Sequence, residues 1–470
     1  MASWFDRERI IARPGFSRWM VPPAALCVHL CIGQAYAFSV FNLPMTKLLG
    51  IVNSPAPPAN LPIAQVISHA QSAPDDWKLT ELGWIFSIAI VMLGLSSALT
   101  GTWLDRVGPR KAMFTAACCF GGGFLVSALG VHLHNLWLVY LGYGVLGGCG
   151  LGIGYISPVK TLITWFPDRP GMATGMAIMG FGGGAMIASP LSVTLMNHFS
   201  TPTHVGVAET FAVMGVIYFC FMSVGAIMVR IPAASWLPAG YVAPIQARRL
   251  ITTENVHVDV ALRTPQFWLL WWVLCLNVTA GIGVLGQASA MSQEMFQGRI
   301  TPGAAAGFVG LLSLFNMMGR FFWASTSDYI GRRNTYFVFF LLGILLYAAV
   351  PTTAHIHSVA LFVLCYLIII SMYGGGFATI PAYLKDIFGV RYVGAIHGRL
   401  LTAWSAAGVF GPVLVNYIRQ YQIDHGVAKA DAYTVTMYIM AGLLFIGFLC
   451  NYFMHPVHER YFLRLQESEV

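Results

Sequence analysis

The stretch Gly101–Lys111 reads GTWLDRVGPRK, and it joins two long apolar runs, at about 81–103 and 111–132. Each run supplies the roughly 20 apolar residues that an α-helix needs to cross the hydrocarbon core of a bilayer. A short charged turn between two such runs predicts a helical hairpin that crosses the membrane and returns. A related stretch, STSDYIGRRN at 325–334, joins two further apolar runs in the same way.

The composition of the whole chain agrees with a membrane protein. Of its 470 residues, 57% are hydrophobic and only 9% are charged, whereas a soluble domain carries about a quarter charged residues. Backbone groups in lipid must pair within their own segment, so the apolar runs are expected to be helices. The sequence therefore predicts an all-α membrane protein with twelve transmembrane helices. The expected spans are about 19–44, 81–103, 111–132, 136–159, 171–195, 207–230, 266–290, 304–326, 335–353, 358–381, 392–417 and 432–454.

The positively charged residues indicate how these helices are oriented. The side with both termini has 20 of the 26 Lys and Arg residues, the other side has five, and Arg320 lies within a helix. Cytoplasmic loops of membrane proteins carry the excess of Lys and Arg. We therefore expect both termini in the cytoplasm and a multi-pass protein of the bacterial inner membrane. This distribution explains the net charge of +8 without a nucleic-acid partner.

The two charged turns belong to an internal repeat with an offset of 223 residues. The same offset relates positions at other helix junctions, and chance does not give so many matches. The longest loop on the side of the termini, about 231–264, separates the two copies. We expect two six-helix halves, 1–230 and 265–470, around a site near the bilayer midplane. The related positions are Asp105 and Asp328, Gly108 and Gly331, Arg110 and Arg333, Pro158 and Pro381, Gly171 and Gly394, and Gly175 and Gly398.

The charged turn resembles the loop motif that follows helix 2 throughout the major facilitator superfamily, and its second copy strengthens the resemblance. The resemblance implies the major facilitator fold. Glycine permits a tight turn, while Asp and Arg are able to form a charge pair that one conformation makes and another breaks. We interpret the two copies as a gate, and a static anchor with ordinary interfacial charges is the alternative. The candidate gate residues are Asp105, Gly108, Arg110, Asp328, Gly331 and Arg333.

Longer stretches narrow the resemblance. GQAYAFSVF at 33–41, WFPDRPGMATGMAIMGFGGG at 165–184, and GGGFATIPAYLKDIFG with GAIHGRLLTAWSAAGVFGP within 374–412 are similar to the oxalate–formate antiporter family and the related monocarboxylate porters. This implies secondary active transport of small mono- or dicarboxylates, such as formate, oxalate, lactate or pyruvate, by alternating access. It implies no cofactor. We expect exchange or facilitated transport by a monomer in the lipid bilayer.

Arg320 is the candidate that binds the substrate. It is the one Lys or Arg deep inside an expected span, away from the span ends, and its partner in the repeat is Ser97, so the fold itself does not require a charge there. Ionisable residues within a membrane are expensive and are functional candidates by default. The resemblance implies that an arginine at this place binds the substrate carboxylate, for which a planar guanidinium is well suited. The alternative is that Arg320 snorkels to the interface or pairs with the loop between the second and third spans.

Other polar and aromatic side chains within the spans are candidates for the same site. Each of them is equally well explained by packing between helices. None of the 18 acidic residues lies in the middle of an expected span, which leaves His29 as a candidate proton site. A packing role is the alternative for His29 as well. The remaining candidate substrate-binding residues are Gln34, Tyr36, Tyr155, Asn316, Tyr373 and Trp404.

Two other classes of function stay open. A carrier of this fold could transport a drug or a sugar, and a membrane sensor could use the fold without turnover. No catalytic, metal-binding or phosphate-binding constellation stands out, so we do not expect an enzyme. The loop at about 47–80 on the other side of the membrane is rich in proline, and the sequence assigns it no role.

Overall fold

The computed structural model describes residues 4–53, 73–201, 203–234, 236–241, 250–296 and 299–463. In these ranges the chain forms helices and turns, together with three isolated β-bridges. Most of the loop expected at about 47–80 lies outside the described residues. The all-helical structure confirms the predicted fold class.

The first half of the chain contains six membrane-sized spans. Its first span combines α1 with the 3-10 helix η3 and the short helix α2, and its fourth combines α6 with the π-helical turn η5 and α7. The elements are α1 (Val21–Ile32), η3 (Gly33–Phe41), α2 (Asn42–Met45), α4 (Leu79–Val107), α5 (Pro109–His132), α6 (Leu136–Val139), η5 (Tyr140–Gly147), α7 (Gly148–Trp165), α8 (Pro170–Phe199) and α9 (Val207–Met228).

The second half repeats this order after a short helix in the connecting segment. Its fifth span is interrupted at Leu401, where α15 ends and α16 begins one residue later. The elements are α10 (Val258–Ala261), α11 (Pro265–Met295), α12 (Pro302–Ile330), α13 (Arg332–His355), α14 (Val359–Phe388), α15 (Val393–Leu400), α16 (Thr402–Asp424) and α17 (Thr434–Tyr452).

These helices account for the twelve predicted spans. Among the described residues, eleven helical segments are long and apolar enough to cross a membrane. The remaining long helix, α12, has 29 residues and carries Asn316 and Arg320 in its interior. Several helices continue beyond the predicted bounds; α14, for example, reaches Phe388 where the apolar run predicts an end near residue 381. Length beyond the apolar run is expected where a helix enters the interface.

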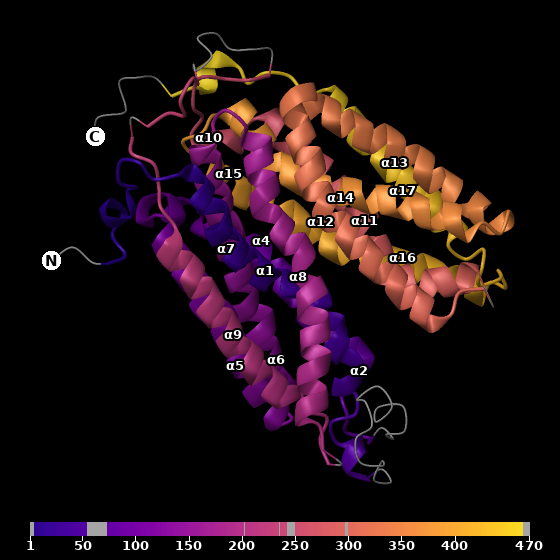
Figure 1. The fold of residues 1–470 in the computed structure, drawn as a ribbon. Helices are drawn as coiled ribbons and strands as arrows, with labels where there is room; N and C mark the ends of the chain where they lie inside the picture. The colour runs from indigo at the N-terminus through magenta and orange to yellow at the C-terminus, as the bar shows by residue number, and fades with distance from the viewer. Residues whose placement is uncertain are drawn as a thin grey trace.

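The two halves meet at one end of the molecule and diverge toward the other. In Figure 1 the indigo to magenta helices and the orange to yellow helices lie close together around α4, α8 and α15, whereas α2 and the far end of α16 lie apart. The described residues next to both termini lie at the end where the halves meet. We call this end, marked by Trp4 and Leu463, the terminal side. In this conformation the terminal side is closed.

Two seams close the terminal side. In one, α8 packs against α12 and α14, and in the other α4 packs against α15 and α16. Glycines let the backbones approach: a Cβ on Gly171 would lie 2.2 Å from the Ala324 carbonyl oxygen, and a Cβ on Gly398 would lie 2.2 Å from the Ser97 carbonyl oxygen. Small residues at such contacts are typical of helix packing in membranes.

The predicted orientation is open to a direct test. In a background without the nine native cysteines, a cysteine at Ala234, which is exposed on the terminal side, is expected to react with a membrane-impermeant maleimide only from the cytoplasm. A cysteine at the exposed Ala428 is expected to react only from outside. The opposite labelling pattern in intact cells would contradict the predicted cytoplasmic location of both termini.

Candidate substrate site

Arg320 lies in the interior of α12 and is completely buried, with 0% of its surface exposed. Its Nε donates to Asn316 Oδ1 at 3.1 Å, one turn earlier in the helix, and its Nη1 donates to the Ile178 carbonyl oxygen of α8 at 3.4 Å. Nη2 has no hydrogen-bond partner among the described residues. The guanidinium is therefore held from two sides and keeps one nitrogen free.

Two glycines make the space that the Arg320 side chain occupies. A Cβ on Gly182 of α8 would lie 2.8 Å from Arg320 Nε, and a Cβ on Gly374 of α14 would lie 2.6 Å from Asn316 Oδ1. Both distances are too short for a real contact. The glycine runs at 182–184 and 374–376 thus serve close packing around a charged side chain.

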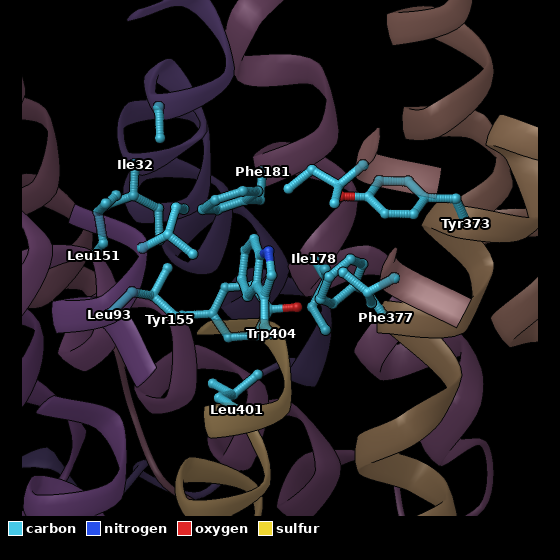
Figure 2. Close-up of a cluster of buried hydrophobic side chains, with 14 of the residues drawn as sticks. Ile32, Leu93, Leu151, Tyr155, Ile178, Phe181, Tyr373, Phe377, Leu401 and Trp404 are labelled. Carbon is cyan, nitrogen blue, oxygen red and sulfur yellow. The ribbon is translucent and has the colours of Figure 1, made fainter. Parts of the chain in front are cut away.

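An aromatic layer surrounds the guanidinium. Arg320 Cζ lies 5.5 Å from the ring centre of Phe181 and 5.3 Å from that of Phe377, distances at which a cation is attracted to a ring. Trp404 contacts both rings, and its centroid lies 5.4 Å from that of Tyr155. Figure 2 shows these side chains gathered between the halves, with the Tyr373 hydroxyl pointing toward them.

Several polar groups in this layer have no partner. The Tyr155 hydroxyl and Trp404 Nε1 are buried and make no hydrogen bond with the described residues. Tyr36 and Tyr155 contact the Phe181 ring, and Tyr373 contacts the Phe377 ring, so all three tyrosines belong to the layer around the guanidinium. Unpaired buried polar groups are destabilising, so donors of this kind next to an unpaired guanidinium nitrogen favour an anion as their missing partner.

The other candidate residues divide into two groups. The Tyr36 and Tyr373 hydroxyls are 3.0 Å apart and join the two halves beside Arg320. Gln34 instead accepts from the Tyr143 hydroxyl at 3.0 Å, and His29 Nε2 lies 3.2 Å from the Tyr155 carbonyl oxygen. Gln34 and His29 thus each have one bond within the first half, whereas Gln34 Nε2 and His29 Nδ1 have no partner among the described residues.

The Tyr36–Tyr373 hydrogen bond predicts a modest effect of its loss. Tyr36→Phe is expected to lower carboxylate uptake about two- to tenfold, because a neutral hydrogen bond contributes about 0.5–1.5 kcal/mol. Uptake by proteoliposomes measures this, with Tyr218→Phe as the matched control, because the Tyr218 hydroxyl is buried without a partner. Equal losses in both variants would mean that the bond between the halves has no special part in transport.

Asp328, a candidate gate residue, forms a polar contact between the halves. Its Oδ1 and Oδ2 accept from the backbone N–H groups of Gly171 and Met172, at 2.9 and 2.8 Å, at the start of α8. A carboxylate at a helix N-terminus also interacts favourably with the helix dipole. Arg332 Nη2 donates to Asp328 at 2.6 Å and Arg332 Nε donates to Asp386 at 3.2 Å. The closed terminal side therefore depends on a buried charge network.

The first copy of the charged turn makes different contacts. Asp105 forms an ion pair with Lys160 of its own half. Arg110 donates to the carbonyl oxygens of Trp4 and Ile227 at 3.1 and 3.2 Å, and Arg333 donates correspondingly to those of Asn451 and Tyr452. Neither arginine pairs with the aspartate of its motif. The two glycines of the motif form the expected tight turns. Their φ angles are 82° at Gly108 and 86° at Gly331, a region that residues with a side chain rarely adopt.

Sequence reasoning missed Arg332, Phe181 and Phe377. Arg332 follows Asp328 at i+4, the spacing at which helical side chains meet, so the sequence held the signal. Phe181 and Trp404 are related by the 223-residue offset of the repeat and contact each other with ring centres 5.3 Å apart. The repeat therefore pointed to this pair as well. The sequence held no comparable signal for Phe377.

The chain belongs to the Major Facilitator Superfamily, whose sequence profile matches residues 24–412. The oxalate:formate antiporter of Oxalobacter formigenes is 28% identical over 334 residues, which is 71% of this chain and 75% of that protein. The apicoplast pyruvate carrier 1 of Toxoplasma gondii is 24% identical, over 84% and 82% of the two chains.

Solved structures agree on the fold. The transporter FucP in its outward conformation has a TM-score of 0.62 at 13% identity, over 93% of this chain and 99% of that one. The human organic anion transporter MFSD10 has a TM-score of 0.61 at 14% identity, over 92% and 99%. These comparisons confirm a multi-pass membrane transporter of the major facilitator fold; the relatives are transporters and not enzymes.

Proposed function

We propose that this chain carries small carboxylates across the bacterial inner membrane, with Arg320 binding the carboxylate group. One observation carries the proposal: Arg320 is fully buried, forms no ion pair with any described residue, and keeps Nη2 free. A buried charge without a counter-ion is strongly unfavourable. An anionic substrate supplies the missing charge, and charge-assisted hydrogen bonds to a planar guanidinium supply the geometry.

The charge of the site favours monocarboxylates. Arg320 is the one fixed positive charge among the described groups of the aromatic layer, and Asn316, Tyr36, Tyr155 and Tyr373 around it are neutral polar groups. A monoanion such as formate, lactate or pyruvate neutralises one guanidinium. The relatives named as oxalate:formate antiporter and pyruvate carrier support a small carboxylate without deciding which one.

Alternating access between the two halves is the proposed mechanism, with 1–230 and 265–470 moving about the segment 231–264. The backbone of Ile231 pairs with Ile10 and Ala12 of the first half, at 2.9 Å in both bonds. Val256 donates to the Phe388 carbonyl oxygen of the second half at 3.0 Å. Each end of the connecting segment is thus fixed to one half. We propose exchange or facilitated transport by single chains.

Counterflow in proteoliposomes tests the proposal. Vesicles loaded with unlabelled formate are expected to accumulate labelled formate, and external lactate, pyruvate or acetate should compete. Hexoses and lipophilic cations serve as controls for the sugar and drug alternatives. Competition by these compounds and not by carboxylates would overturn the proposed substrate class. Saturable binding with no counterflow would instead indicate a sensor.

A further inference from the structure

His397 is a buried ionisable residue that the proposed mechanism does not use. It lies on α15, only 1% of its surface is exposed, and its Nε2 has no hydrogen-bond partner among the described residues. Its ring centre lies 5.9 Å from that of Tyr155. A buried imidazole nitrogen without a partner is unfavourable. We therefore asked in which conformation this nitrogen would gain one.

The position of His397 relates it to the substrate site. His397, Leu401 and Trp404 are spaced at i, i+4 and i+7, so they lie on one stripe across the α15–α16 junction, and Tyr155 contacts the rings of both His397 and Trp404. Arg320 is ten residues from the end of α12, about 15 Å along the axis, whereas His397 is four residues, about 6 Å, from the start of α15. His397 thus lies between the Arg320 site and the terminal side.

The two halves share this contact. Tyr155 belongs to α7 of the first half and His397 to α15 of the second, and α15 also packs against α4. In alternating access, opening the terminal side separates α15 from α4 and α7. That movement exposes Nε2 of His397 to the path that leads from Arg320 to the cytoplasm.

From this geometry we infer that His397 is a second carboxylate-binding residue, which binds the substrate anion on the terminal side of Arg320 when that side is open. The inference rests on the proposed function and adds a step to it. The closed conformation covers Nε2, and the open conformation offers it to an anion that leaves or approaches Arg320. The site would therefore affect transport from one side of the membrane only.

Protonation should strengthen this binding, since an imidazolium adds a positive charge to its N–H donor. Tyr155 is the titratable side chain whose ring contacts His397 in the described part of the chain. Most charged side chains on α15 and on the helices around it form ion pairs of their own. The ion pairs are Lys160 of α7 with Asp105 of α4, Arg399 of α15 with Asp259 of α10, and Asp386 of α14 with Lys385 and Arg332. Arg106 of α4 is exposed, and His29 of α1 contacts the Tyr155 ring from the side of the first half.

Sided transport measurements test the inference. Formate uptake is measured in inside-out and right-side-out membrane vesicles that carry the parent or His397→Gln. We expect His397→Gln to raise the half-saturating formate concentration about tenfold from the terminal side, and to leave it within about twofold from the other side. In the parent, the terminal-side value should fall as the pH is lowered from about 8 to 5.5, and His397→Gln should remove this dependence.

His29→Gln is the comparison variant. His29 contacts the same Tyr155 ring, at 5.5 Å between centres, but its Nε2 already lies at a main-chain carbonyl oxygen. If a substitution only disturbs the packing around Tyr155, the half-saturating formate concentration should change equally from both sides of the membrane. We expect this result for His29→Gln. An equal change of the half-saturating concentration on both sides in His397→Gln, or a retained pH dependence, would overturn this inference but not the proposed function. A parent that takes up no carboxylate from either side would instead contradict the proposed function.

Discussion

Replacement of Arg320 by Gln is expected to abolish carboxylate transport, and Arg320→Lys is expected to lower it strongly. Gln removes the charge that the substrate would neutralise in a fully buried site. Lys retains the charge but loses the planar guanidinium. In the parent, the guanidinium donates from Nε to Asn316 while Nη2 stays free for the substrate. Hydrogen bonds to charged groups contribute about 1.5–3 kcal/mol, which corresponds to a factor of about 10 to 150 in affinity.

Counterflow by purified variants in proteoliposomes measures this loss. Arg419→Gln is the matched control because Arg419 also lies on a spanning helix but is paired with Glu294 in a bidentate contact. Loss of the Arg419–Glu294 contact is expected to lower the stability of the protein more than its transport rate. Both variants must reach the membrane in the amount of the parent. An Arg320→Gln variant that inserts normally and transports at the parental rate would show that Arg320 has a structural role.

Asp328→Asn is expected to slow transport about tenfold or more while leaving the affinity for carboxylate nearly unchanged. The Asp328 carboxylate accepts from two backbone N–H groups of the other half and from Arg332. An amide has one oxygen, so one N–H group would lose its partner and Arg332 would lose part of its counter-charge. The conformation with the terminal side closed should then be destabilised relative to the open one. This shifts the conformational equilibrium without changing the groups that bind the substrate.

Asp105→Asn provides the comparison for this prediction. The gate interpretation also predicts slower turnover there with affinity retained, but the structure bonds Asp105 to Lys160 within the first half. We therefore expect the smaller effect from Asp105→Asn. Turnover in counterflow and equilibrium binding of formate should be measured on both variants. A loss of affinity without a loss of turnover in Asp328→Asn would show that the motif is not a gate.

The spans and the repeat were predictable because lipid imposes strong rules on sequence. Twenty apolar residues are needed wherever a helix crosses, and the duplication preserved charged and glycine positions at one offset. Within a span, hydrophobicity does not decide the type of helix. The 3-10 segment Gly33–Phe41 was not predictable for this reason. Its packing depends on a contact with α8, where a Cβ on Gly33 would lie 2.5 Å from the Phe181 carbonyl oxygen.

The hydrogen-bond partners of the candidate residues were harder to predict than the location of these residues within the spans. Gln34 and Tyr36 lie two residues apart, yet Gln34 bonds to Tyr143 in its own half and Tyr36 bonds to Tyr373 across the halves. Which way each side chain points depends on the local helix geometry, which the sequence does not specify. The free nitrogen of Arg320 likewise follows from its bonds to Asn316 and Ile178, and the second of these joins helices that are distant in sequence.

Equilibrium binding of formate to the purified parent and to Arg320→Gln is the most direct test of the central claim. Binding separates the site from the conformational cycle, which transport measurements do not. Isothermal titration at constant pH and salt is expected to give saturable binding to the parent and an affinity at least about tenfold weaker for Arg320→Gln. Equal affinity in a folded Arg320→Gln protein would contradict the assignment of Arg320 as the carboxylate-binding residue.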